Sequence, residues 1–337
     1  MSDREGNIVG LQKIVSDMWE NVLSPNTAKA YESGVKQYRT FMCKDGYCAA
    51  NTDVPPISED IIIKFIAYLF NRLHIQYSTI KIYLCGLRHH YIKHGVCSPL
   101  ESNSKNVRIY TFLKSVKRKQ TTQSKRLPID INMLSKIVDY LKKGCFGVHD
   151  DAMMISCCTL AFFGFLRCGE FTVKNTFSVY DNLCLTDVRF DKERVSVTLK
   201  TSKTDPFRKG VNISIYATHN AVCPMEALSD YLKVRKLHHA ARGTEALYIS
   251  FDGMPLTRSK FIHNLKFVTR ILGLDDSRYN GHSLRIGAAT TCGKLRLEDH
   301  LIKLWGGGLR IAILHISTRT KKQYKRLKLL CQRRKFK

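Results

Sequence analysis

A histidine and an arginine three residues apart are the residues of this sequence best suited to chemistry. His282 and Arg285 follow the turn pair Asn280-Gly281 and begin a stretch of small residues typical of a helix. Residues at i and i+3 share a helical face, so both side chains can reach one ligand. A planar, permanently charged guanidinium beside an imidazole suits a phosphate oxygen, and the amino end of a helix also attracts anions. An isolated pair of this kind is more often a surface arginine and a capping histidine, so the interpretation depends on other residues.

A second arginine and a basic hairpin tip supply those residues. Arg167 directly follows a strongly apolar stretch, 150–164, and precedes a Gly-Glu pair. An arginine after a buried helix is costly unless it has an anionic partner or ligand. Lys203 lies in a basic tip, 200–210, between two stretches of alternating apolar residues, and Lys200 is the alternative lysine in the same tip. These residue types together indicate chemistry on a phosphate.

The amino-terminal part of the chain predicts a helical domain over residues 20–116. Helices are expected to begin near Ser24-Pro25, Ser58 and Ser78, because a serine before an apolar periodic run is typical of a helix start. A fourth helix is expected near 105–119, and basic residues alternate with the apolar ones. Residues before this domain predict a short leader with one or two amphipathic turns.

The second domain is predicted over residues 129–304, after a polar, basic linker at 117–128. Alternating apolar residues predict strands, and apolar residues at helical spacing predict helices. The expected strands are 187–190, 195–199 and 211–215, and the expected helices are 131–143, 150–164, 224–237 and 258–272. The fold class is therefore mainly α with a small antiparallel sheet.

Composition narrows the class of partner. Lysines and arginines exceed acidic residues by 55 − 28 = 27 in a chain of 337 residues. An excess this large indicates a polyanionic partner, most often nucleic acid, with an affinity that falls as salt rises. No apolar run approaches the length of a membrane span, and the amino-terminal residues do not resemble a signal peptide. We therefore expect no membrane partner.

The cysteines argue against a metal centre. The chain has 12 cysteines but no Cys-x-x-Cys pair, and Cys157, Cys158 and Cys168 lie inside apolar patterns. Zinc or a disulfide framework is therefore disfavoured. Buried, reduced thiols are typical of a cytosolic or nuclear protein. We predict a nuclear, or nuclear and cytoplasmic, location.

The order of these residues resembles the tyrosine recombinase superfamily, the phage-integrase-like enzymes. Arg167 before Gly-Glu, Lys203 in a hairpin and the His282/Arg285 pair follow the order of that family. Within it, residues 202–210 and 281–291 most resemble eukaryotic transposon-encoded members, the DIRS-type and Crypton groups. The resemblance extends over residues 20–304 and is most specific in the second domain. It implies a helical, SAM-like core-binding domain and a catalytic domain that together clamp duplex DNA.

The resemblance also implies a reaction, site-specific cutting and rejoining of DNA without a metal or small-molecule cofactor. A tyrosine attacks the scissile phosphate and forms a 3′-phosphotyrosyl link, and the bond energy is kept in this covalent intermediate. By motif, Arg167 and Arg285 would hold the phosphate oxygens. Lys203 would protonate the leaving 5′ oxygen, and His282 would assist proton transfer or orientation. Four protomers would assemble on double-stranded DNA at synapsis.

The carboxyl-terminal end departs from the family pattern. The family places a Trp or His, then the nucleophilic tyrosine shortly afterwards, in a pattern like L-G-R-W-x-S-x-x-Y-x-x-Y. In this chain three glycines follow Trp305, and the next tyrosine, Tyr324, comes 324 − 285 = 39 residues after Arg285, which is several too many. Three successive glycines also disfavour the helix that the family has here.

A change of reading frame accounts for this departure. Permitted codons for residues 305–316, read two bases later, encode G-R-W-S-S-D-C-Y-S-T-Y, which is the family pattern in register. The tyrosine then spans the codons of His315 and Ile316. We therefore interpret residues 305–337 as an off-frame basic tail, shifted just after Lys303, and expect the chain to be inactive as written. The alternative is a divergent carboxyl-terminal end that uses Tyr324 as the nucleophile.

Two other functions fit the same residues. A non-catalytic recombinase relic would still bind DNA after losing its nucleophile. A topoisomerase-like enzyme would share the chemistry but relax supercoils as a monomer. Activity on a suicide DNA substrate separates the relic from a recombinase.

Overall fold

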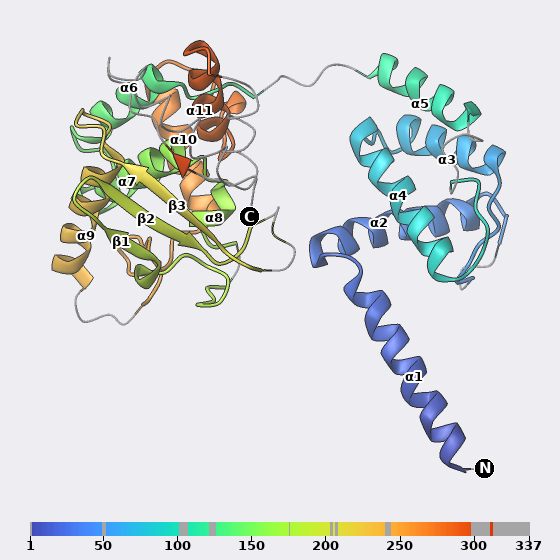
Figure 1. The fold of residues 1–337 in the computed structure, drawn as a ribbon. Helices are drawn as coiled ribbons and strands as arrows, with labels where there is room; N and C mark the ends of the chain where they lie inside the picture. The colour runs from blue at the N-terminus through green and yellow to red at the C-terminus, as the bar shows by residue number, and fades with distance from the viewer. Residues whose placement is uncertain are drawn as a thin grey trace. The chain divides into compact units, whose positions relative to one another are not determined.

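In the computed structural model of this protein, the described residues are 2–48, 52–100, 107–120, 126–174, 176–202, 205, 208–239, 244–297 and 311–312. The chain divides into two compact units, Met1–Gln123 and Ser124–Lys337. Helices dominate both, and the second unit contains a small sheet (Figure 1). The predicted fold class is therefore confirmed.

The first unit contains only helices among its described residues. They are α1 (Ser2–Asn21), α2 (Pro25–Lys44), α3 (Glu59–Asn71), α4 (Tyr77–Lys93) and α5 (Val107–Lys119). The side chain of Ser24 accepts a hydrogen bond from the Thr27 amide at the start of α2, and that of Ser58 accepts one from the Ile61 amide at the start of α3. These two serine caps explain why the helices begin where the sequence predicts.

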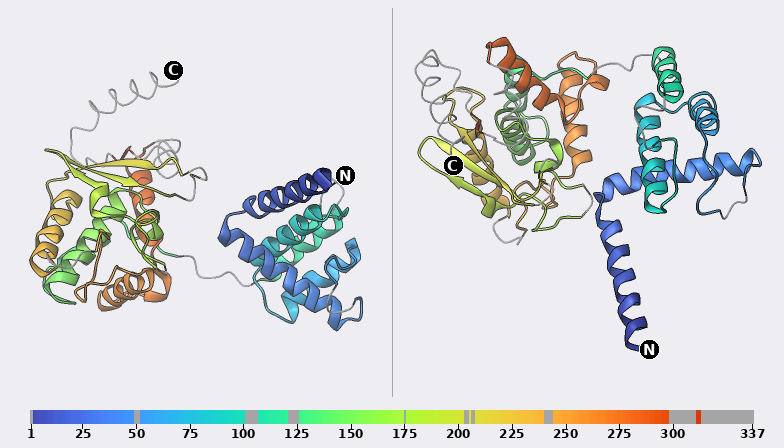
Figure 2. Two further views of the ribbon diagram at one scale, coloured as in Figure 1. Left: turned by 90° about the horizontal axis from the view of Figure 1, so that it is seen from below. Right: turned by 45° about the vertical axis from the view of Figure 1, so that its right-hand side comes forward.

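Helices α2 and α4 cross at very short range (Figure 2). A Cβ atom built on Gly34 would lie 2.7 Å from the Tyr83 Cα atom, and one on Gly86 would lie 2.7 Å from the Tyr31 Cα atom. Each helix therefore places a glycine against the backbone of the other. The core beside this crossing includes the buried aromatic side chains of Tyr38, Phe41 and Phe65.

One prediction about this unit is wrong. The residues predicted as a short leader form one continuous helix of 20 residues, α1, because its apolar residues recur at helical spacing and the first proline is Pro25. Residues 117–119, where the predicted helix near 105–119 and the predicted linker overlap, belong to α5, as the helix prediction has it. Basic side chains suit the carboxyl end of a helix, where the backbone carbonyls carry partial negative charge.

In the second unit, the other elements pack around a buried helix, α7. Its helices are α6 (Ile131–Leu141), α7 (Val148–Phe163), α8 (Cys168–Phe171), α9 (Pro224–His239), α10 (Arg258–Ile271) and α11 (Ser283–Lys294), with two short 3-10 turns at Leu185–Asp187 and Asp276–Arg278. Nearly every residue of α7 is buried, as its strongly apolar sequence predicts. Helices α6, α9 and α11 pack against it.

The sheet contains three antiparallel strands and one short parallel strand. Strands β1 (Val188–Phe190), β2 (Arg194–Leu199) and β3 (Val211–Tyr216) pair in chain order. The fourth, β4 (Ile311–Ala312), pairs in parallel with β3. The antiparallel part confirms the prediction. The parallel strand β4 was not predicted, because a strand of two residues is too short to show an alternation of apolar and polar residues. It also lies in the segment interpreted as off-frame.

Candidate active site

Arg167 lies at a sharp change of direction after α7. Gly164 ends that helix, and Phe165 adopts a left-handed backbone conformation with φ of 51°, which L-residues other than glycine rarely adopt. Arg167 then caps α8: its guanidinium Nη1 lies 2.9 Å from Glu170 Oε1, and its amide donates to Glu170 Oε2 at 2.7 Å. The anionic partner that the sequence demanded is therefore Glu170, whose side chain is only 6% exposed against 20% for Arg167. A guanidinium has five N–H donors. The ion pair with Glu170 therefore orients the Arg167 side chain and does not use all of its donors.

Arg285 reaches the same segment from α11. Its Nη1 donates a hydrogen bond to the carbonyl of Phe165. The strained conformation of Phe165 therefore directs its carbonyl towards Arg285. Phe165 itself lies two residues before Arg167 in the sequence. Arg167 and Arg285, 118 residues apart in sequence by 285 − 167, meet at a single turn of the backbone.

The turn before α11 is held by its own side chains. Asn280 Oδ1 accepts a hydrogen bond from the His282 amide at 2.9 Å, and the Asn280 amide donates to Ser283 Oγ at 3.0 Å. Asparagine stabilises such turns by bonding the backbone two residues on. The predicted turn is therefore confirmed, and it directs His282 and Arg285 from the first turn of one helix.

Gly281 fits this turn directly against α8. A Cβ atom at Gly281 would lie 2.4 Å from the Cβ atom and 2.8 Å from the Sγ atom of Cys168. Cys168 is the residue after Arg167, so the two halves of the site touch where only a glycine fits. At the other side of α11, a Cβ atom at Gly287 would lie 1.7 Å from the Ile129 carbonyl oxygen.

The hairpin tip between β2 and β3 approaches Arg167. Ser202 Oγ lies 3.4 Å from Arg167 Nη1 and 3.4 Å from Glu170 Oε1. Lys203 itself lies outside the described residues, but its neighbour Ser202 places this part of the tip at the arginine. The predicted association of the hairpin with the site is therefore visible at Ser202.

Lys200, the alternative lysine, is bound to Asp187, Cys184 and Val179. Its ammonium lies 2.8 Å from Asp187 Oδ2 and donates to Cys184 Sγ at 3.1 Å and to the Val179 carbonyl at 2.7 Å. Burial alone would lower the pKa of Lys200, but the bonds to Asp187 and Cys184 outweigh it and raise that pKa. Lys200 therefore anchors the base of the hairpin in the structure.

The charges of four arginines act on His282. Burial lowers its pKa, and the positive charges of Arg126, Arg258, Arg285 and Arg167 lower it further. The imidazole is thereby biased towards its neutral form, in which one ring nitrogen donates and the other accepts. The sequence prediction did not include Arg126 or Arg258. Arg126 lies at the end of the basic linker, and Arg258 follows a capping threonine. Neither position is a specific signal of a functional residue.

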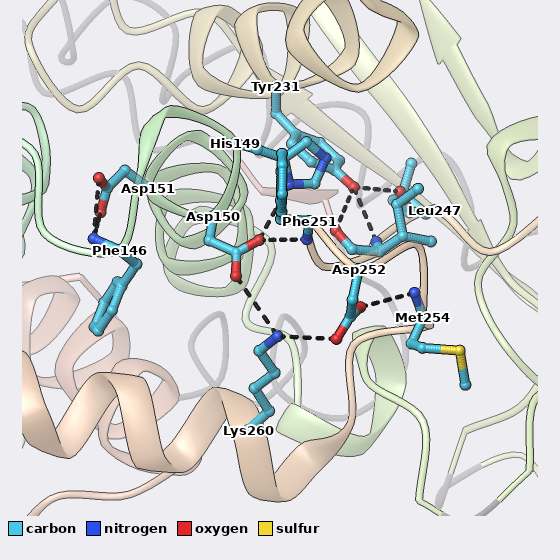
Figure 3. A network of polar contacts seen from close by, with 11 residues as sticks. Phe146, His149, Asp150, Asp151, Tyr231, Leu247, Phe251, Asp252, Met254 and Lys260 are labelled. Carbon is cyan, nitrogen blue, oxygen red and sulfur yellow. Dashed lines mark hydrogen bonds and ion pairs between the residues drawn. The ribbon is translucent and has the colours of Figure 1, made fainter. Parts of the chain in front are cut away.

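A polar network around the buried Asp150 fixes the start of α10, the helix that carries Arg258 in its first turn (Figure 3). Asp150 on α7 accepts a hydrogen bond from the Phe251 amide at 2.7 Å, and its other oxygen lies 3.6 Å from the ammonium of Lys260. Lys260 also lies 3.7 Å from Asp252. The network therefore ties α10 and the 250–254 loop to the buried helix of the unit.

The described residues contain neither a candidate metal site nor a candidate membrane span. Within the residues that the structure describes, no group of histidines, cysteines and carboxylates could hold a metal ion. The cysteines in these same ranges are free thiols. None of the helices in the described part of the chain is long and apolar enough to cross a bilayer. Tyr324 lies outside the described residues.

Comparison with known proteins gives one relative and a set of solved folds. No protein-family model matches the chain. The integrase/recombinase XerD homolog of Selenomonas ruminantium is 24% identical over 286 residues, which are 81% of this chain and 75% of that protein. XerH site-specific recombinase, in a post-cleavage complex with a palindromic difH substrate, has a TM-score of 0.59 and 17% identity over 89% of this chain and 76% of its own.

The Tn1549 transposon integrase in complex with transposon right-end DNA has a TM-score of 0.58 and 12% identity, over 93% of this chain and 96% of its own. At such identities the solved structures show the fold alone. The sequence match covers most of the chain and includes both units. In sequence and in fold, the chain is therefore similar to site-specific recombinases and integrases, as its resemblance to the tyrosine recombinase superfamily predicts.

Proposed function

We propose that the second unit is the catalytic domain of a site-specific DNA recombinase that acts on a DNA phosphodiester. One observation carries the proposal: Arg167, His282 and Arg285, from two distant parts of the sequence, converge on the turn between α7 and α8. Two guanidinium groups and an imidazole are a cradle for a phosphate that gains negative charge during reaction. The recombinases and integrases to which the chain is similar act on DNA in their own complexes.

The proposed reaction assigns one step to each side chain. A tyrosine oxygen forms a bond to phosphorus as the bond to the 5′ oxygen breaks, and the strand end stays linked to the protein. Arg167 and Arg285 stabilise the charge on the non-bridging oxygens. His282, biased towards its neutral form, can accept or relay the tyrosine proton. Lys203 gives a proton to the departing 5′ oxygen. The contrast with Lys200, which is bound to Asp187, supports this choice of lysine.

We further propose that the chain derives from a mobile element of the DIRS-type or Crypton kind, works in the nucleus and acts as a homotetramer at synapsis. The chain as written is proposed to lack its nucleophile, because residues 305–337 follow an altered reading frame. A non-catalytic relic that binds double-stranded DNA through the same basic residues is the second candidate. The strongly positive chain supports DNA binding in either case.

A nicked suicide duplex tests the proposal, because it traps the covalent intermediate. Three proteins are compared: the chain as given, its Tyr324→Phe variant, and a frame-restored chain in which G-R-W-S-S-D-C-Y-S-T-Y follows Leu304. We expect a denaturation-resistant adduct only from the frame-restored chain. An adduct from the chain as given that disappears in Tyr324→Phe would make Tyr324 the nucleophile and reject the reading-frame account. Duplex binding without any adduct in all three proteins would favour the relic.

A further inference from the structure

Helix α1 carries a row of exposed apolar side chains. Five large apolar residues on this helix or in the turn after it are each at least half exposed: Leu11, Ile14, Val15, Met18 and Val22. Single apolar side chains on a surface are normal, but a contiguous row of them indicates an interaction site. The last turn of α1 is held to the first unit, because the ring centroids of Trp19 and of His89 on α4 lie 6.0 Å apart. The row is therefore a defined surface that the first unit presents to solvent.

The spacing of this row indicates which kind of partner it fits. Four of the exposed residues follow one another in steps of four, three and four: Leu11, Val15, Met18 and Val22. In the sequence, Ile8 adds a step of three before Leu11. Apolar residues in alternating steps of three and four occupy the a and d positions of a heptad, the repeat of a coiled coil. The a positions hold β-branched residues here, and the d positions hold leucine and methionine. β-branched residues at a with leucine at d favour two strands in a parallel coiled coil.

The charges of α1 favour a second copy of the same helix over DNA. The helix has four acidic residues and two basic ones, Asp3, Glu5, Asp17 and Glu20 against Arg4 and Lys13, in a chain with 27 more basic than acidic residues. An acidic excess disfavours contact with phosphates. The e and g positions beside the seam are all uncharged: Asn7, Gln12, Ile14, Trp19 and Asn21. Two copies of α1 therefore meet without like charges on either side of the seam, and in a parallel pair Ile14 faces the partner's Trp19.

We propose that α1 pairs with α1 of a second copy of this chain in a short parallel coiled coil. This surface goes beyond the proposed reaction and does not rest on it. The seam is shorter than the roughly three to four heptads over which a coiled coil is recognised from sequence. We therefore expect a reversible association that increases with concentration. Two chains bound at neighbouring DNA sites have a raised effective concentration and should pair more readily.

The oligomeric state of the full chain tests this pairing. Sedimentation equilibrium is measured over a concentration series in about 1 M salt, where charges are screened over about 3 Å and the basic chains no longer repel each other. Val15→Glu places a carboxylate in the seam. Ser16→Glu places the same group on the next residue, at an outer position of the heptad, and is the matched control. Both residues are exposed on α1, so neither substitution changes a buried core.

We expect the parent chain and Ser16→Glu to show the same monomer–dimer equilibrium. Val15→Glu should weaken it by roughly 10-fold or more, because a carboxylate in an apolar seam loses water without gaining a partner. Val15→Asn should weaken it less, because asparagines at an a position meet and bond each other in a parallel pair. A loss in Val15→Asn as large as that in Val15→Glu would overturn the parallel arrangement.

Three results would overturn the pairing itself. They are a parent chain that stays monomeric at every concentration, a dimer that Val15→Glu and Ser16→Glu weaken equally, and a dimer that persists unchanged in Val15→Glu. The last result would place the contact between copies on another surface. The measurement needs neither DNA nor a nucleophile, so failure of the pairing leaves the proposed recombinase function intact.

Discussion

Replacement of Gly281 by alanine should separate the two halves of the candidate active site. The added Cβ atom would lie 2.4 Å from the Cys168 Cβ atom, whereas carbon atoms in contact are about 3.5 to 4.0 Å apart. The turn that carries His282 must therefore move from α8 by more than about 1 Å. Forced overpacking of this kind typically costs about 1 to 3 kcal/mol of stability. A misplacement of about 1 Å can cost roughly 100-fold in rate.

The assay is cleavage of a nicked suicide duplex by the frame-restored chain, with urea unfolding measured in parallel. Gly293→Ala in α11, the helix that follows this turn, is the matched control, because nothing lies within 4 Å of a Cβ atom built there. We expect Gly293→Ala to keep the parent rate and to gain up to about 1 kcal/mol of stability, as alanine is the better helix former. Gly281→Ala should lose roughly 100-fold in cleavage.

A second substitution tests whether the contact with Cys168 is the cause. Cys168→Ala keeps the Cβ atom that lies 2.4 Å away, so it should not restore cleavage to Gly281→Ala. Cys168→Gly removes both the Cβ and the Sγ atom and should restore a substantial part of it. Cleavage at the parent rate by Gly281→Ala alone, or equal rescue by the two cysteine variants, would refute this account of the site.

Three further outcomes are expected. Lys200→Met should destabilise the chain in urea unfolding, because it leaves the Asp187 carboxylate, only 11% exposed, without its ion pair. Lys203→Met, in contrast, should abolish cleavage and leave the stability unchanged. Burial raises the pKa of Asp150, but His149, the Phe251 amide and Lys260 outweigh it and hold that pKa below 3.8. Asp150→Asn should therefore destabilise the chain at neutral pH, and its difference from the parent in urea unfolding should shrink as pH falls below 3.8. Duplex binding measured at about 50 and 200 mM salt should weaken on the order of 1,000-fold if six phosphates are contacted, and an affinity that does not change with salt would contradict the nucleic-acid interpretation.

Local signals explain the elements that could be predicted from the sequence. Serine caps at Ser24 and Ser58, the apolar helix before Arg167 and the alternation along β2 and β3 each act within one element. Such signals do not depend on the rest of the fold. The turn at Asn280 is of the same kind, since its side chain bonds the backbone of His282 two residues on.

The parts that could not be predicted depend on contacts between distant residues. Nothing in the sequence near Gly281 indicates that Cys168 will lie against it, and nothing near Arg126 indicates that its charge will act on His282. The sequence left Lys200 and Lys203 as alternatives because both belong to one basic tip. Only the fold brings Asp187 to Lys200 and so distinguishes them.

The central claim is that Arg167 and Arg285 act together on one phosphate, and their alanine variants in the frame-restored chain test it most directly. Arg167→Ala and Arg285→Ala should each slow adduct formation on the suicide duplex by roughly 100- to 1,000-fold, the usual cost of removing a transition-state donor. Each should retain most of the parent affinity for duplex DNA, because many other basic residues contribute to it. Adduct formation at the parent rate by either variant would contradict the assignment of that arginine to the site.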